Sequence, residues 1–126
     1  DTVMPGLAVN DFGDSIRFGA STGAEDEKDL SRISCDMELY DIYAKGFVEG
    51  CGGALTDMEI ECLPIGAKVM TYECGMRFLT DYLSGDTYFK VDYPTHNLDR
   101  TRTQLKLVWD MEQKLSQMKA IVQKYK

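Results

Sequence analysis

Apolar side chains recur every three or four residues in three parts of the chain, which is the spacing of one face of an α-helix. The three parts are residues 30–48, 65–83 and 98–125. No stretch alternates apolar and polar residues over five or more positions, as a half-buried strand would. The pattern predicts an all-α chain of four to five helices with a long last helix. Four aromatic residues fall at helical spacing and are expected in the core: Tyr40, Tyr43, Phe47 and Tyr72.

Capping and breaking residues predict where the first elements begin and end. Residues 1–13 are expected to be irregular and residues 14–18 to form a short helix. Ser21 or Thr22 is expected to cap the first long helix, because the acidic residues that follow suit the positive end of the helix dipole. A glycine cluster that starts at Gly50 is expected to end this helix.

The second half of the chain carries clearer boundary signals. Thr56 and Glu59 have the spacing of a capping box, so a helix is expected to begin there. Pro64 is expected to close this short helix and to occupy the first turn of the next one, over residues 65–83. After an aromatic loop, a single long helix is expected over residues 97–125.

Composition narrows the class of protein. The net charge is -7 over 126 residues, with +5 in residues 100–126 and -12 in the rest. An acidic body argues against nucleic acid as a partner. No apolar run approaches the ~20 residues that span a bilayer, so no membrane partner is expected. Four cysteines without a C-x-x-C pair, and a single histidine, indicate reduced thiols rather than zinc ligands. A cytoplasmic protein is the expectation.

The triplet Asp11-Phe12-Gly13 has the letters of the magnesium-binding motif of protein kinases. In those enzymes an ATP-binding lobe and a catalytic loop precede the motif, whereas only ten residues precede Asp11 here. The triplet alone is therefore interpreted as a coincidence.

Two longer segments carry more information: DTVMPGLAVNDFGDSIRFGA, and the later run TYECGMRFLTDYLSGDTYFKVDYPTHNLDRTRTQLKL. Together they resemble the C-terminal part of the aminoglycoside phosphotransferase and choline kinase family, most closely the bacterial N-acetylhexosamine 1-kinases. The resemblance covers essentially all 126 residues. It implies a single helical domain over residues 1–126 that corresponds to the helical C-lobe subdomain of a kinase-like fold. The ATP-binding lobe and the catalytic loop would lie before Asp1.

The resemblance also implies an activity. Such enzymes transfer the γ-phosphate of ATP to the anomeric hydroxyl of N-acetylhexosamines. ATP and Mg²⁺ would serve the full-length enzyme, and neither is expected to bind this chain, which is expected to be inactive alone. The partners implied are the sugar acceptor and the N-terminal part of the same protein. An apolar surface left exposed without that part would also favour a homo-oligomer.

The same resemblance points to individual residues. Asp1 matches the second acid of the family's metal segment, near Mg²⁺ but not its main ligand. Asp14, with Asp11 as the fallback, matches a buried acid that braces the catalytic loop; the alternative is that Asp14 caps the helix that follows it. Arg77 and Tyr88 match residues that line the acceptor site.

Other interpretations of these residues stay open. Arg77 has the spacing of a salt bridge with Glu73 or Asp81, four residues away on either side. His96 is expected to brace the loop before the last helix. The same fold could serve a choline-type or aminoglycoside acceptor, although Arg77 would repel those cations. A non-catalytic helical interaction module is the alternative from a different class.

Overall fold

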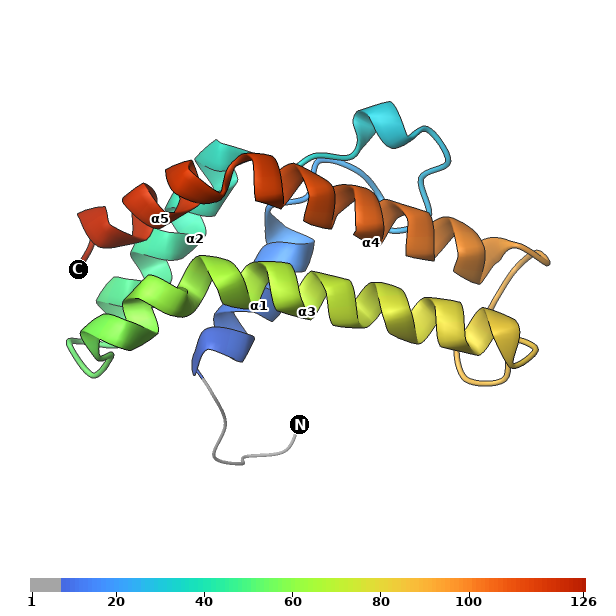
Figure 1. Ribbon diagram of the computed structural model, residues 1–126, viewed down its shortest axis with the longest axis horizontal. Helices are drawn as coiled ribbons and strands as arrows, with labels where there is room; N and C mark the ends of the chain where they lie inside the picture. Colours follow the sequence, from blue (N-terminus) through green and yellow to red (C-terminus); the bar gives the residue numbers. More distant parts are fainter. Residues whose placement is uncertain (1–7) are drawn as a thin grey trace.

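The computed structural model describes residues 8–126, and this part of the chain is all-helical, which confirms the predicted fold class. The helices are α1 (Ala8–Gly19), α2 (Met37–Gly50), α3 (Asp57–Leu83), α4 (His96–Gln113) and α5 (Leu115–Lys124), with a 3-10 turn, η1 (Leu30–Arg32), before α2. Helix α3 lies at the centre: α1 crosses it near its middle, and α4 and α5 run back along its length (Figure 1).

Helix α1 begins earlier than predicted. Residues 1–13 were expected to be irregular, yet residues 8–13 are helical. The reason is tertiary packing, since Phe12 and Ile16 are fully buried one turn apart and Gly13 lies against α3. Burial of this apolar face outweighs the weak helix propensity of the glycine and of the neighbouring Asn and Asp residues. Asp1 lies outside the described residues.

Helix α2 begins later than predicted. Its N-cap is Asp36, whose Oδ1 accepts hydrogen bonds from the backbone N–H groups of Glu38 and Leu39 at 2.9 and 3.1 Å. The expected caps at Ser21 and Thr22 are therefore wrong. The acidic residues after them lie in an irregular segment that packs on α1 and α4, where Glu25 meets Arg17 and Arg100, and Asp26 meets His96, instead of a helix terminus.

Helix α3 is one continuous helix where two were predicted. The capping box is confirmed: the Thr56 hydroxyl accepts from the Glu59 N–H at 3.1 Å, and the Glu59 carboxylate accepts from the Thr56 N–H at 2.9 Å. Pro64, however, does not end the helix. It lacks one backbone donor, but it is buried together with Leu63 and Ala67. This burial keeps the helix running through the proline.

The apolar stripe predicted for the core faces outward on α3. Ile65, Val69 and Tyr72 are 40%, 49% and 51% exposed. In the middle of α3 the buried face consists of small residues: Gly66, Ala67, Thr71 and Gly75. Small residues let α1 and α4 approach α3 closely, so this face packs inward although its side chains there are the smaller ones. Tyr72 is therefore not a core residue. On α2, Tyr43 is also exposed and lies outside the core, whereas Tyr40 is fully buried.

The predicted long last helix is broken at Lys114, between α4 and α5. The Lys114 ammonium donates to the Cys35 carbonyl at 2.8 Å and to the Asp110 carboxylate at 2.7 Å. The same carboxylate accepts from the Cys35 N–H at 2.7 Å. These bonds hold the segment before α2 against the break and direct α5 across α2.

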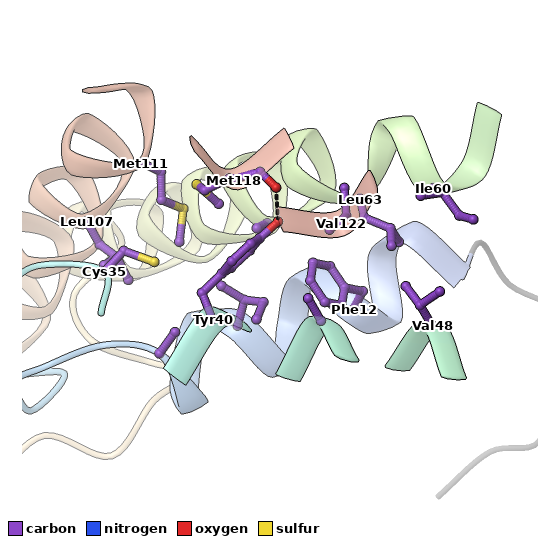
Figure 2. Packing of buried hydrophobic residues seen from close by; sticks show 14 of the residues in the cluster. Phe12, Cys35, Tyr40, Val48, Ile60, Leu63, Leu107, Met111, Met118 and Val122 are labelled. Atoms are coloured by element: carbon purple, nitrogen blue, oxygen red, sulfur yellow. Dashed lines mark hydrogen bonds between the residues drawn. The ribbon is translucent and has the colours of Figure 1, made fainter. Parts of the chain in front are cut away.

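The core joins all five helices (Figure 2). Phe12 of α1 packs edge-on against Tyr40 of α2, with the ring centres 5.8 Å apart. The Tyr40 hydroxyl donates to the Met118 carbonyl of α5 at 3.2 Å. Leu63 of α3 and Val122 of α5 complete the fully buried cluster. All four cysteines are free thiols, and Cys35 is buried in this core.

Candidate functional site

A pocket of about 470 Å³ lies at the C-terminal end of α3, where the chain turns back after the helix. Its walls come from the last three turns of α3 and from the loop that follows. The lining residues are Glu73, Met76, Arg77, Thr80, Asp81, Ser84, Thr87, Tyr88 and Phe89. The pocket therefore brings together Arg77 and Tyr88, the two residues that the sequence resemblance assigned to acceptor binding.

Arg77 is exposed in this pocket beside two aromatic rings. Its guanidinium carbon lies 5.8 Å from the ring centre of Tyr88 and 5.8 Å from that of Phe89. The ion pairs within residues 8–126 do not include Arg77. The alternative of a salt bridge to Glu73 or Asp81 is thus wrong, and Arg77 lines the pocket.

The Asp81 carboxylate bonds to the loop instead. It is 5% exposed and accepts from the backbone N–H of Tyr88 at 2.7 Å and of Phe89 at 3.0 Å. The Asn97 side chain, at the start of α4, donates to it at 2.8 Å. Desolvation opposes the charged form, but these hydrogen bonds outweigh it and lower the pKa of Asp81 below its ordinary value. Sequence reasoning considered Asp81 only as a partner of Arg77.

Tyr88 and Phe89 differ in how they are held. Tyr88 is 74% exposed and lines the pocket, so much of its ring is available to a ligand. Phe89 packs against Phe78 of α3, with the ring centres 4.7 Å apart. It also touches Tyr88 edge-on at 4.8 Å. Phe89 thereby anchors the loop, while Tyr88 forms the outer wall.

Asp14 and Asp11 lie on α1, which crosses α3 well away from this pocket (Figure 1). The Asp14 side chain is 63% exposed and lies 3.6 Å from the Arg17 Nε. Because Asp14 is in the middle of α1, the alternative that it caps a helix is wrong. Asp11 is exposed in the first turn of α1. Their role in bracing a catalytic loop stays a prediction, since such a loop would come from outside the described residues.

His96 braces the loop before α4, as predicted. Its Nδ1 accepts from the Asp92 N–H at 3.1 Å, and its Nε2 lies 2.8 Å from the Asp26 carboxylate. The ring is 3% exposed and stacks on Tyr93 at 4.6 Å. With Nδ1 as an acceptor, Nε2 carries the proton donated to Asp26. The histidine ties the loop to the irregular segment before α2 and does not reach the pocket.

The donors needed for Mg²⁺ do not converge in residues 8–126. No group of three His, Cys, Asp or Glu side chains in that range is arranged to hold a metal ion. The resemblance placed the Mg²⁺ ligands at and before Asp1, which falls outside the described residues, so that assignment stays a prediction. Within the same range, no helix has the length and apolar character to cross a membrane.

No protein-family model matches this chain. The resemblance to N-acetylhexosamine 1-kinases thus stays a prediction from the quoted sequence segments, and the pocket beside Arg77 is the observation on which a function can be built.

Proposed function

We propose that this chain is the acceptor-binding helical part of an ATP-dependent sugar kinase that phosphorylates the anomeric hydroxyl of N-acetylhexosamines. The observation that carries the proposal is the Arg77 guanidinium, which has no carboxylate partner among residues 8–126 and stands beside the Tyr88 and Phe89 rings in a pocket. A volume of about 470 Å³ suits a small ligand.

The chemistry of this wall fits an amino sugar. An aromatic face packs against the C–H face of a pyranose ring, and Tyr88 is exposed enough to do so. The fixed donors of Arg77 can bracket ring hydroxyls or the acetamido carbonyl. Thr80 and Ser84 add hydroxyl groups to the lining. In this role the chain binds and orients the acceptor.

The remaining groups of the reaction would come from the segment that the resemblance places before Asp1. ATP and Mg²⁺ would supply the phosphoryl group and offset its charge in the full-length enzyme. The resemblance places the ATP-binding lobe and the catalytic loop in that segment as well, so this chain alone is expected to transfer no phosphate. The protein is proposed to act in the cytoplasm, where ATP and amino sugars are available.

A cationic acceptor is the alternative within the same fold. Choline or an aminoglycoside would require carboxylates toward the pocket, and Glu73 is the one exposed acid in its lining. The exposed charge of Arg77, one turn along the same helix, would repel such a ligand. This balance favours a neutral sugar.

A thermal-shift screen of the full-length enzyme tests the proposal. N-acetylglucosamine and N-acetylgalactosamine are expected to raise the melting temperature, and choline and kanamycin are not. The shift should disappear in Arg77→Gln and persist in the control Arg32→Gln, because Arg32 is on η1 and its side chain is 70% exposed. Stabilisation by choline alone would overturn the choice of acceptor.

A helical interaction module is the second candidate, and the outward apolar face of α3 favours it. Ile65, Val69 and Tyr72 form this face. Leu105 and Trp109 of α4, 38% and 54% exposed, flank the same helix. Exposed apolar surface of this kind marks an interaction site.

In the kinase proposal, the part of the same protein that precedes this chain covers this face, and without that part a second copy of the chain covers it. Light scattering of the wild-type chain and of Val69→Glu measures whether a second copy covers the face or the face is free. A monomer in the wild type would contradict self-association.

A further inference from the structure

The turn after α3 directs the chain back along the helix. Gly85 and Asp86 have φ values of 92° and 60°, in the left-handed region, and the Asp86 N–H donates to the Asp81 carbonyl at 2.8 Å. This reversal brings Tyr88 and Phe89 beside the last turns of α3. The position of the Tyr88 ring therefore depends on the contacts that hold the backbone of the loop after the turn.

Among residues 8–126, the groups that hydrogen-bond to the Asp81 carboxylate are N–H donors and one hydroxyl. Oδ1 accepts from the Tyr88 N–H, and from the Thr87 hydroxyl at 3.5 Å. Oδ2 accepts from the Phe89 N–H and from the Asn97 amide. The ion pairs of residues 8–126 include none with Asp81. An ionised carboxylate can accept all of these bonds, whereas a neutral amide would direct its own N–H group at some of the donors.

Asn97 joins the same carboxylate to the turn and to α4. Its side-chain amide donates to both Asp81 and Asp86, the latter at 3.0 Å. Its Oδ1 accepts from Arg100 at 2.9 Å. Asn97 is fully buried, so the hydrogen-bond network is held between the turn after α3 and the first turn of α4. Asn97 thus links Asp81 to Asp86 in the turn and to Arg100 on α4, and Arg77 on α3 lines the same pocket as Asp81.

We propose that Asp81 is a positioning residue for acceptor binding: its ionised carboxylate holds the Tyr88 and Phe89 backbone so that the Tyr88 ring stays opposite Arg77. This inference rests on the proposed function and deepens it, because sugar affinity then depends on a buried side chain that acts through the loop. Replacing the carboxylate should release the loop without removing Arg77 or Tyr88 from the chain.

The test compares wild type, Asp81→Asn and the control Asp57→Asn in two measurements. Asp57 is on the same helix, and its side chain is 82% exposed at the far end from the pocket. Amide hydrogen exchange by NMR reports on the loop, and calorimetry reports on N-acetylglucosamine affinity. In Asp81→Asn, exchange of the Tyr88 and Phe89 amides should accelerate by roughly tenfold or more, and affinity should fall by about tenfold. Asp57→Asn should change neither.

The outcomes separate the two proposals. Faster exchange with unchanged affinity would overturn the positioning role and leave the proposed function standing. If wild type binds no N-acetylhexosamine, the proposed function fails; unchanged exchange in Asp81→Asn would overturn the loop-holding role in either case. Should Asp81→Asn not fold, the pH titration of wild-type amide shifts decides. Tyr88 and Phe89 should report one carboxyl ionisation below the ordinary Asp range, and the absence of such a transition overturns the inference.

Discussion

An alanine at position 13 would place a methyl group in the closest contact between α1 and α3. A Cβ built on Gly13 meets the carbonyl oxygen of Gly66, lies 2.6 Å from its carbonyl carbon and lies 2.9 Å from the Met70 Cγ. Met70 is a flexible side chain and can move. The Gly66 atoms are backbone in the middle of a long helix, so α1 would have to shift away from α3.

The expected cost follows from two opposing terms. Alanine is a better helix former than glycine by about 1 kcal/mol. Overpacking a close contact costs about 1–3 kcal/mol, and the upper end applies because the obstacle is backbone. A shift of α1 would also loosen the packing of Phe12 and Ile16, both fully buried. We expect Gly13→Ala to destabilise the fold by about 2 kcal/mol.

Gly46 provides a matched control. It lies within α2, and a Cβ built there has no neighbour within 4 Å. Gly46→Ala should therefore gain only the propensity term and stabilise the protein by about 1 kcal/mol. Urea unfolding followed by far-ultraviolet circular dichroism measures both variants. If Gly13→Ala also stabilises the protein, the close approach of α1 and α3 is refuted.

Three further substitutions or titrations test the core. Burial raises the pKa of the Cys35 thiol from 9.0 to about 12, so the thiol ionises at lower pH in the unfolded chain than in the folded one. The free energy of unfolding, measured by urea titration at a series of pH values, should therefore fall as pH rises from 9.0 to about 12. Asp110→Ala should cost about 1–3 kcal/mol in urea unfolding, because it leaves the buried Cys35 N–H without its acceptor and removes one of the two acceptors of the Lys114 ammonium. A neutral result would contradict the role of these bonds at the helix break. Tyr40→Phe should cost about 1 kcal/mol through loss of the bond to Met118, and an unchanged midpoint would show that bond to be negligible.

The elements that could be predicted from sequence are those set by local interactions. Helical periodicity predicted the all-α fold, and the capping box at Thr56 and Glu59 is confirmed because both partners lie within one turn. The start of α2, the passage through Pro64 and the break at Lys114 depend on contacts between distant segments. The local capping signal at Ser21 was therefore misleading, because these contacts determine where α2 begins.

The orientation of α3 shows why an apolar stripe can mislead. The helix carries two apolar faces, one with large residues such as Val69 and Tyr72 and one with small residues such as Gly66 and Gly75. Periodicity predicts that the face with large side chains lies in the core. In the structure the neighbouring helices pack on the face with small side chains, because glycine allows their backbones to approach.

The candidate site was predictable only in part. The resemblance pointed to Arg77 and Tyr88, and the structure places them around one pocket. Asp81 was missed as an organiser of the loop, because its partners include the backbone amides of Tyr88 and Phe89. Backbone donors leave no signature in side-chain patterns. An acid three residues after the buried Phe78, on the core face of α3, was the available signal.

The pocket beside Arg77 is proposed to bind a neutral amino sugar. An NMR titration of the isotope-labelled chain with N-acetylglucosamine tests this binding most directly. We predict saturable shifts confined to the pocket residues between Glu73 and Phe89, lost in Arg77→Gln and retained in Arg32→Gln. The absence of saturable shifts in wild type, or the same shifts in Arg77→Gln, would contradict it.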